Sequence, residues 1–352
     1  MSNKLQFVWL VAIGLILSLC FTFSVTPEQA IQFQPAKISN NLSNLYLPKH
    51  KDFRIVVISD LNSQYGSTKY EPEVEQAIAL IPQWQPDLVL CGGDMIAGQK
   101  TSLDRTQIES MWQAFDRHIA QPLRQERIPF GFTIGNHDGS GAIKEQSLIF
   151  EQERDLAKAY WHKHQSVLGL NFIETANYPF YYSFQQNGIF FLVWDASTQN
   201  ISQQQLTWVR QALNSNIAQQ SKTKIVIGHL PLYPVAVAKN KPGEYLAQGE
   251  KLRSLLQQHQ VQLYISGHHH AYYPGKKEQL ELLHAGALGQ GSRQLIDSSL
   301  SPYPSITVVD LEFATSKTTY TTYNAKTWEL IDPKQLPTSI TVNNETIIRH
   351  DL

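Results

Sequence analysis

The sequence has 352 residues, 42% of them hydrophobic, which is enough to bury an ordinary core in one large or two small domains. Its 29 lysine and arginine residues balance 30 aspartate and glutamate residues, and no basic cluster stands out. A stable nucleic-acid partner is therefore not expected. Only two cysteines are present, and one of them lies in the N-terminal apolar stretch, so a disulfide framework is excluded.

The N-terminal segment differs from the rest of the chain. No charged residue occurs between Lys4 and Glu28, and the stretch from Phe7 to Phe23 is almost wholly apolar. This pattern is typical of an export signal or a membrane anchor. Because no clean cleavage site follows, cleavage and retention both stay open. In either case we expect the folded body outside the cytoplasm, as an exported periplasmic or extracellular protein or as a membrane-anchored one.

Four segments follow from composition and pattern. Residues 1–27 form the signal peptide or membrane anchor, and 28–50 are a polar linker rich in Gln and Asn. Residues 51–315 form the main domain. The remainder, 316–352, is rich in β-branched and aromatic residues, which predicts a β-rich extension packed on the same domain.

Within the body, predicted strands and helices alternate. After a first strand at RIVVIS, apolar residues at helical spacing and Pro72 near the start predict a helix from Glu71 to Trp84. The pair Asn187-Gly188 between two apolar runs predicts a β-hairpin. The runs SITVVDLEFA and TTYTTYNA predict antiparallel strands near the end of the chain. Further helical patterns cover 102–121, 144–166, 202–218 and 244–259.

Five short apolar runs end abruptly in a tight turn that carries Asp, Asn or His. Runs of this length that are rich in Val, Ile and Leu predict strands buried on both faces. In open α/β sheets, functional groups gather beyond the carboxyl ends of such strands. A cluster of oxygen and nitrogen donors at one sheet edge predicts a metal site. The residues at the five strand ends are Asp60 and Asn62, Asp94, Asn136 to Asp138, His229, and His268 to His270.

The donor types indicate two metals rather than one. A carboxylate can bridge two ions and an imidazole cannot, so Asp60 and Asp94 are the candidate bridging residues. Side chains alternate along an extended segment, so His268 and His270 can converge while His269 points elsewhere. Each residue taken alone has an ordinary explanation, such as a helix cap for Asp60. Their joint occurrence favours the metal site.

Four of these blocks, in this order, resemble those of the calcineurin-like metallophosphoesterases: Gly92 to Asp94, Gly135 to Asp138, His229 within GHLP, and Gly267 to His270. The resemblance covers about residues 51–290. It implies an α/β fold, a four-layer α/β/β/α sandwich of two mixed sheets flanked by helices, with a dinuclear metal site at the strand C-terminal edge.

The resemblance also implies a ligand set for two divalent ions, which are Mn, Fe, Zn or Mg. The first ion takes Asp60, Asp94 and His270; the second takes Asp94, Asn136, His229 and His268. One block departs from the family, which usually has Asp-x-His where this chain has Asp60-Leu61-Asn62. Either Asn62 is a ligand through its carbonyl oxygen, and then the first metal binds less tightly, or it supports a ligand or contacts substrate.

The function that the resemblance implies is hydrolysis of phosphoric esters by a hydroxide held between the metals. His137 is expected to face the substrate and Asp138 to orient it. The substrate is a small-molecule or macromolecular phosphoester, and phosphatase activity on monoesters is favoured. Two alternatives stay open: a phosphodiesterase acting on nucleotide or lipid-type diesters, and a non-catalytic metal-binding relative, for which Asn62 is the sequence argument. The N-terminal apolar segment would serve as a membrane tether.

Overall fold

The computed structural model describes residues 45–352. The predicted signal or anchor and most of the predicted linker lie outside the described residues, so both stay predictions. Within residues 45–352, no helix is long and apolar enough to cross a lipid bilayer.

The first of two large sheets has five strands in the order β14-β13-β1-β2-β3. It is mixed, because β1 pairs in parallel with β2 and antiparallel with β13. All six residues of β1, FRIVVI, are buried, as the apolar run Ile55–Ile58 predicts; the buried Arg54 pairs with Asp310 at 2.9 Å. The strands are β1 (Phe53–Ile58), β2 (Leu88–Cys91), β3 (Phe130–Phe132), β13 (Ser305–Glu312) and β14 (Lys317–Asn324).

The second sheet has nine strands in the order β15-β16-β11-β12-β10-β9-β8-β7-β6. It is also mixed: β8, β9, β10 and β12 run in parallel, and antiparallel strands flank them on both sides. The strands are β6 (Asn171–Asn177), β7 (Tyr181–Gln186), β8 (Ile189–Val193), β9 (Thr223–Ile227), β10 (Leu263–Ser266), β11 (Tyr273–Lys277), β12 (Leu280–His284), β15 (Ser339–Val342) and β16 (Glu345–Arg349).

The two sheets pack face to face through aromatic side chains. Phe53 of β1 lies 6.3 Å from Phe191 of β8, and Phe132 of β3 lies 5.6 Å from Tyr182 of β7, measured between ring centroids. Gly131 leaves room for the ring of Phe184. The interior between the sheets is therefore a dry, close-packed layer.

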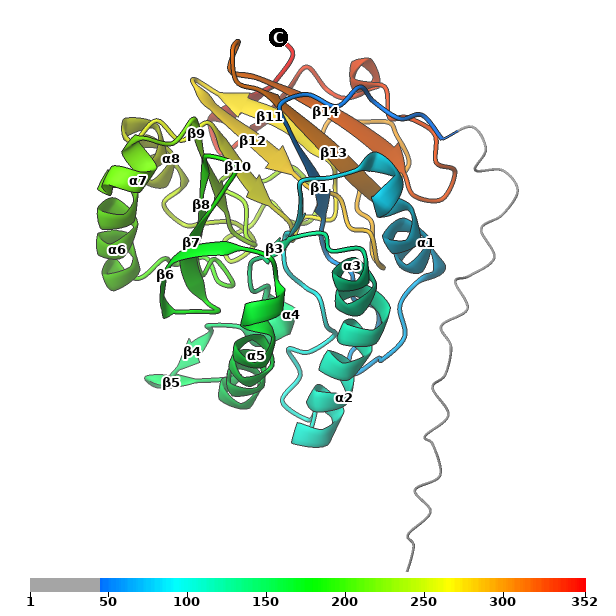
Figure 1. The fold of residues 1–352 in the computed structure, drawn as a ribbon, viewed down its shortest axis with the longest axis vertical. Helices are drawn as coiled ribbons and strands as arrows, with labels where there is room; N and C mark the ends of the chain where they lie inside the picture. Colours follow the sequence, from blue (N-terminus) through cyan, green and yellow to red (C-terminus); the bar gives the residue numbers. More distant parts are fainter. Residues whose placement is uncertain (1–44) are drawn as a thin grey trace, which may run out of the picture. The chain divides into compact units, whose positions relative to one another are not determined.

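Helices cover the outer faces of the sheets, which completes the predicted four-layer α/β/β/α sandwich (Figure 1). In Figure 1, α6, α7 and α8 lie beside the nine-stranded sheet, and α1, α2, α3 and α5 lie on the side of the five-stranded sheet. The helices are α1 (Pro72–Leu80), α2 (Arg105–Phe115), α3 (Gln121–Gln125), α4 (Asn136–Gly139), α5 (Glu151–His164), α6 (Gln203–Asn214), α7 (Asn216–Gln219) and α8 (Gly249–Gln258).

Several local predictions match the structure. The pair Asn187-Gly188 has positive φ at both residues and joins the antiparallel strands β7 and β8. The predicted helix after β1 is α1 followed by a short 3-10 helix, Ile81–Trp84. Asp104 caps α2 by accepting from the backbone N–H of Gln107. The chain continues from α2 through a π-helical turn, Asp116–Ala120, into α3.

The prediction of a helix over 144–166 is wrong at its beginning. Residues 143–148 form a small antiparallel hairpin instead, with β4 (Ile143–Lys144) and β5 (Ser147–Leu148), and α5 begins at Glu151. Glu145 and Gln146 both have positive φ, which a helix cannot accommodate. The predicted helix over 244–259 likewise begins later, at Gly249.

The chain beyond residue 315 contributes strands to both sheets. Strand β14 pairs with β13 along its whole length, from Ser305 opposite Asn324 to Glu312 opposite Lys317. Strand β16 pairs with β11 of the other sheet. The C-terminal residues therefore extend the edges of both sheets.

Candidate metal centre

The predicted donor residues converge at one edge of the sandwich. Strands β1, β2 and β3 are parallel neighbours in one sheet, and β9 and β10 are parallel neighbours in the other. Their carboxyl ends therefore point the same way within each sheet. Backbone hydrogen bonds join the loops that follow: the N–H of Asp60 donates to Gly93, and the N–H of Gly267 donates to His229.

Four of the donor residues have a strained backbone. Asp60, Asp94, His268 and His270 all have positive φ, between 51° and 66°. This left-handed conformation is uncommon for residues other than glycine and costs about 1 kcal/mol or more at each position. The fold maintains it at four donors at once, which is typical of a functional site.

Glycines allow the loops to approach each other closely. A Cβ atom on Gly135 would lie 2.1 Å from the Asp94 carboxylate, and one on Gly267 would lie 2.6 Å from the Asp60 carboxylate. Neither position can hold a larger residue without displacing a donor. The glycines in the GNHD and GHHH blocks are thus required by the packing of the donors themselves.

Asp60, Asp94 and His270 form the first group of candidate ligands. One ligand atom from each lies within 4.8 Å of the others. The Nε2 atom of His270 is 3.2 Å from a carboxylate oxygen of Asp60, and its Nδ1 atom lies 3.0 Å from the carbonyl oxygen of Gly291. A proton on Nδ1 would bond this carbonyl, which leaves Nε2 free to bind a cation.

Asp94, His229 and His268 form the second group, again with ligand atoms within 4.8 Å of one another. The Nδ1 atom of His229 lies 2.8 Å from the carbonyl oxygen of Gly92. Its Nε2 atom faces the amide oxygen of Asn136 at 2.9 Å and a carboxylate oxygen of Asp94 at 3.3 Å. Asp94 belongs to both groups, as a bridging ligand must.

His268 supplies an independent test of whether a cation fits. Its Nε2 atom bonds the Glu244 carboxylate at 2.9 Å. Its Nδ1 atom is buried and has no hydrogen-bond partner among the described residues. A buried, unpaired ring nitrogen is costly unless it binds something else. The orphaned Nδ1 atom and the neighbouring carboxylate and imidazole donors fit a divalent cation.

Glu244 is a site residue that the sequence did not predict. Its carboxylate contacts the Nε2 atom of His268 at 2.9 Å and the ammonium group of Lys239 at 2.6 Å. Carboxylates in this position fix the tautomer and orientation of a ligand histidine. The KPGEYL segment has no periodicity or motif that would identify Glu244 as a site residue. Its contact with His268 is made by the tertiary structure, between residues that are far apart in the sequence.

Charge within the cluster shifts the pKa values of its members. Burial alone would raise the pKa of Asp60, but His270 outweighs it and the pKa is lowered. The pKa of Asp94 is likewise lowered, since His229 and His137 outweigh burial. Burial would lower the pKa of His229, yet the carboxylate of Asp94 raises it to about 9. The carboxylates therefore stay ionised and attract positive charge.

His137 lies at the entrance of this cluster. Its Nδ1 atom is 3.0 Å from the carbonyl oxygen of Gly98, and its backbone N–H donates to Asp94 at 2.8 Å. The ring is 5.3 Å from that of Tyr65. With Nδ1 directed at a carbonyl, Nε2 is the ring atom available to a bound substrate.

Asp138 does not orient His137 as expected. Its carboxylate accepts hydrogen bonds from the backbone N–H groups of Met95, Ile96 and Gly135, at 2.6 to 2.9 Å. Asp138 is fully buried, and burial together with Asp94 raises its pKa to about 7. It ties the GGD turn to the GNHD turn, because a carboxylate can accept several N–H groups at once.

Asn62 lies beside the cluster but shows no side-chain hydrogen bond among the described residues. Its backbone N–H donates to the backbone carbonyl of Asp94 at 3.2 Å, and its backbone carbonyl accepts from the N–H of Gln290 at 3.1 Å. It is 7% exposed. The backbone position is thus well defined, and the role of the side-chain amide as a ligand stays a prediction.

His269 points away from the cluster as predicted, but not by the alternation of an extended strand, because His268 and His270 have positive φ. Its Nδ1 atom accepts from the N–H of Val235 at 3.1 Å, and its Nε2 atom donates to the carbonyl of Glu244 at 2.9 Å. The His269 ring therefore holds both ends of the 235–244 segment by hydrogen bonds, next to the metal cluster. His284, also buried, lies between the carbonyls of Tyr273 and Tyr233, within the core.

The cluster opens into a cleft of about 470 Å³. Its lining includes Asp94, Asn136 and the three histidines His137, His268 and His270. The other lining residues, which form its walls, are Tyr65, Gln99, Ser140, Ala142, Ser197, Thr198, Gln199, Leu230, Lys239, Gly243, Glu244 and Arg293. The cleft is large enough for a small phosphoester.

Comparison with known proteins places the chain in a family. The profile of the calcineurin-like phosphoesterase family matches residues 53–272. Comparison with curated protein sequences gave no match. Among solved structures, the fold is similar to that of purple acid phosphatase PPD1 from yellow lupin (Lupinus luteus) seeds, with a TM-score of 0.56 and 16% identity over 82% of this chain. The chain spans 54% of the length of that phosphatase.

The fold is also similar to that of GAP50, described as the anchor in the inner membrane complex of Plasmodium. The TM-score is 0.51 at 16% identity, and the match covers 81% of this chain and 88% of that chain. At these identities the two structures show likeness of fold alone. The family profile extends over more than half of the sequence and contains the Asp60, Asp94, GNHD, His229 and GHHH blocks, so this chain belongs to the calcineurin-like phosphoesterase family.

Proposed function

We propose that this chain is a metal-dependent hydrolase that prefers phosphoric monoesters. One observation carries the proposal: Asp94 belongs to two groups of candidate ligands, each with its donor atoms within 4.8 Å of one another. A shared carboxylate between two such groups is the arrangement of a two-metal phosphoesterase site.

Two divalent cations bound here would lower the pKa of a water molecule and neutralise the phosphate oxygens. The residues of the chain do the rest. The carbonyl of Gly98 holds the ring of His137 through Nδ1, and Nε2 lies 3.9 Å from a carboxylate oxygen of Asp94 in the lining of the cleft. When protonated, Nε2 can donate to the oxygen that leaves phosphorus, as a general acid does.

The donor set narrows the choice of metal. Carboxylate, amide oxygen and imidazole together suit Mn, Fe and Zn, whereas Mg prefers oxygen ligands and water. We propose that the Asp60 side of the site binds its metal less tightly than the His229 side. The reason is that Asn62 offers a neutral amide where the family has an imidazole.

A second candidate function is that of a metal-binding relative without turnover. The observation that favours it is the same Asn62. A similar fold serves as the anchor in the inner membrane complex of Plasmodium, which is consistent with a non-catalytic use of this architecture. The cleft and the position of His137 favour catalysis over this second candidate.

We further propose that the body works outside the cytoplasm, either exported to the periplasm or the exterior or held at a membrane by the N-terminal apolar stretch from Phe7 to Phe23. Its partner is then a phosphoester substrate, with no stable nucleic-acid partner.

The test uses the full chain, purified in detergent without chelator. Hydrolysis of p-nitrophenyl phosphate and of bis(p-nitrophenyl) phosphate is measured with Mn, Fe, Zn and Mg, and metal content is determined by elemental analysis. We expect about two metals per chain and faster cleavage of the monoester. Faster cleavage of the diester would make it a phosphodiesterase. Two bound metals without any turnover would favour the non-catalytic relative, and no bound metal after reconstitution would end the two-metal proposal.

A further inference from the structure

Exposed apolar side chains lie on segments that line the polar cleft. Four of the large hydrophobic residues that are exposed on this protein belong to segments that form its walls. They are Tyr65, Ile143, Ile149 and Val237, and their exposed fractions are 56%, 66%, 41% and 49%. The walls themselves include Tyr65, Ala142 and Lys239. A polar floor is thus combined with an apolar rim, which we define as these four residues.

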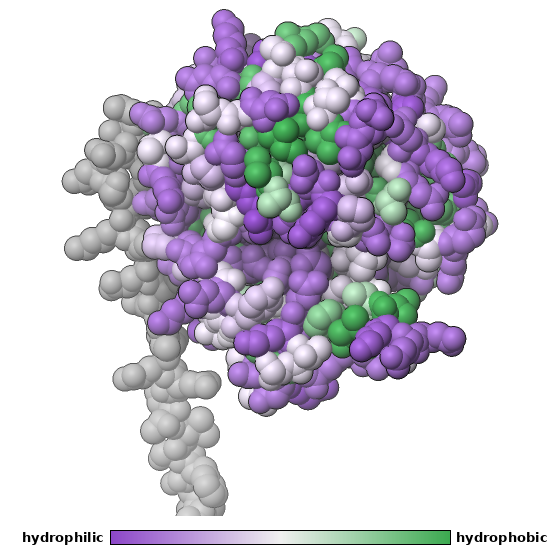
Figure 2. All heavy atoms as spheres, turned by 180° about the vertical axis from the view of Figure 1, so that it is seen from behind, coloured by the Kyte–Doolittle hydropathy of each residue, from purple (hydrophilic) through white to green (hydrophobic). Residues whose placement is uncertain are grey.

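The β4–β5 hairpin carries one side of the rim. Ile143 pairs with Leu148 across the hairpin, so that both side chains lie on one face. Ile149 is bonded through its N–H to the carbonyl of Ala142, which itself lines the cleft. Figure 2 shows hydrophobic side chains gathered over this hairpin, at the lower right, beside a hydrophilic recess.

The exposed isoleucines of the hairpin contribute little to the stability of the fold. The turn of the hairpin at Glu145 and Gln146 is exposed, and both residues have positive φ. A two-stranded ribbon of this kind gains almost no stability from its own side chains. The exposure of the isoleucines therefore favours a contact between these side chains and another molecule.

Val237 lies on the segment that His269 holds next to the metal cluster. The N–H of Val237 donates to the carbonyl of Gln294 at 2.8 Å, which holds its backbone in place. Beside it, the exposed Lys241 adds positive charge, as Lys144 does on the hairpin. Both sides of the cleft thus combine exposed apolar groups with an exposed lysine, although on the hairpin the exposed Glu145 follows Lys144.

We propose that the cleft acts on the phosphoester headgroup of an amphipathic lipid at a lipid surface, with the apolar rim in contact with the acyl region. This inference rests on the proposed hydrolase function and deepens it by naming the substrate class. A phosphate on the polar floor leaves the apolar part of such a substrate at the rim, where burial of aliphatic surface is favourable. Apolar groups flanked by lysines are what an anionic lipid surface binds.

The amino-acid sequence offers independent support. The uncharged stretch from Phe7 to Phe23 is long enough to associate with a membrane, and a polar linker connects it to the body. A rim of four side chains would by itself bind a bilayer only weakly and reversibly. Tethering raises the effective concentration of the rim at the same surface.

The reaction is a hydrolysis and needs no other reactant. Water forms a bond to phosphorus, the bond from phosphorus to the lipid oxygen breaks, and a proton passes to that oxygen. A monoester such as phosphatidate would give diacylglycerol and inorganic phosphate.

The first experiment compares two substrates with full-length protein. We measure kcat/KM on dioleoyl phosphatidate vesicles and on p-nitrophenyl phosphate, and take their ratio. In the double variant Ile143→Ser, Val237→Ser we expect this ratio to fall at least about tenfold, because the rim contributes only with the lipid. The matched control replaces two exposed residues remote from the cleft, Val167→Ser and Ile217→Ser, and should keep the wild-type ratio. An unchanged ratio in the rim variant would overturn the proposal.

A second measurement does not depend on turnover. Ile143→Cys in a Cys20→Ser background is labelled with an environment-sensitive dye, since the remaining Cys91 is buried. Anionic vesicles of phosphatidylcholine and phosphatidylserine should shift its emission to the blue, whereas a dye on Ile217→Cys should not respond. A shift without any hydrolysis would mean that the function fails and the lipid-facing rim stands. Hydrolysis of p-nitrophenyl phosphate with no shift would mean the reverse.

Discussion

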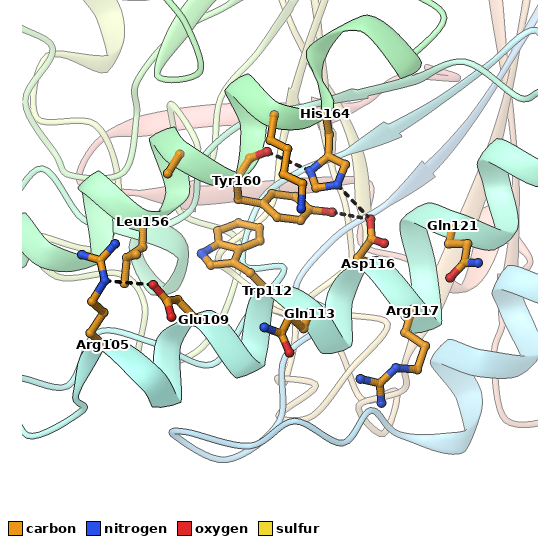
Figure 3. A pocket seen from close by; sticks show the side chains of 12 residues that line it. Arg105, Glu109, Trp112, Gln113, Asp116, Arg117, Gln121, Leu156, Tyr160 and His164 are labelled. Carbon is orange, nitrogen blue, oxygen red and sulfur yellow. Dashed lines mark hydrogen bonds and ion pairs between the residues drawn. The ribbon is translucent and has the colours of Figure 1, made fainter. Parts of the chain in front are cut away.

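The cleft at the candidate metal centre and a groove between α2 and α5 have similar volumes, but their polar side chains are arranged differently. The groove encloses about 430 Å³ and the cleft about 470 Å³. In the groove, the ring of Trp112 stacks on that of Tyr160 at 4.7 Å between centroids. Figure 3 shows these rings at the centre, with Arg105 and Glu109 at one end and Asp116 and His164 at the other.

Several polar groups in and beside the groove bind one another. Asp116 accepts two hydrogen bonds from Arg124 and one from the hydroxyl of Tyr160. Arg105 pairs with Glu109 at 2.9 Å. The indole nitrogen of Trp112 is buried without a partner among the described residues. These contacts explain the groove as a junction between two helices.

Polar groups in the cleft are arranged for a ligand instead. The Nδ1 atom of His268 has no partner within the described part of the chain, and four donors there hold a strained backbone. Two carboxylates, Asp60 and Asp94, are buried beside three histidines. Size and apolar character therefore do not distinguish a functional site in this protein, whereas the convergence of buried carboxylates and imidazoles does.

The largest expected effect separates the two regions directly. Asp94→Asn should lower kcat/KM by at least about 10³-fold, equivalent to about 4 kcal/mol, because the shared ligand of both metals is lost. Bound metal should fall in parallel, as elemental analysis would show. The matched variant in the groove, Asp116→Asn, should keep activity within about twofold of wild type. Equal losses in the two variants would contradict the comparison.

A substitution of Asp138 tests whether its carboxylate stabilises the fold by joining the GGD and GNHD turns beneath the cleft. In Asp138→Ala three buried N–H groups lose their acceptor. We expect the free energy of unfolding to drop by about 3 kcal/mol, as measured by urea denaturation at pH 7. A change smaller than about 0.5 kcal/mol would show that water or another group replaces the carboxylate.

Asn62 tests whether the weaker metal position is understood. In Asn62→His an imidazole replaces the amide, and the dissociation constant of the weaker site should fall by roughly tenfold, or about 1.4 kcal/mol. Metal titration into apo wild type and apo variant, followed by calorimetry, measures this. Identical affinities would show that residue 62 does not bind metal.

The smallest effect concerns the groove. The pKa of Asp116 is lowered, since Arg124 outweighs the opposing effect of burial. The carboxylate therefore stabilises the fold above its ordinary pKa of 3.8, and this contribution is lost as the pH falls through its lower folded value. Because the pair is partly exposed, Asp116→Asn should cost only about 1 kcal/mol at pH 7. The difference from wild type should shrink in urea titrations as the pH is lowered below 3.8; a constant difference would contradict this account.

The sequence was informative wherever local chemistry decides the structure. Buried runs such as RIVVIS predicted strands, and Asn187-Gly188 predicted a hairpin that the structure contains. It was misleading over 144–150, where residues at helical spacing form the β4–β5 hairpin. Nothing in the local pattern identified the turn at Glu145 and Gln146, since neither residue is a usual turn former at positive φ.

The candidate site divides in the same way. Residue types and their place after predicted strands were enough to propose Asp60, Asp94 and the histidines as donors, because carboxyl ends of parallel strands meet at one sheet edge. Tertiary structure alone decided what each donor faces. It paired Glu244 with His268, turned Asp138 toward three backbone N–H groups, and brought Ala142 and Lys239, from the segments that carry Ile143 and Val237, into the lining of one cleft. These contacts join residues far apart in the chain, and their geometry follows from packing of the two sheets and the loops between them rather than from any local sequence preference.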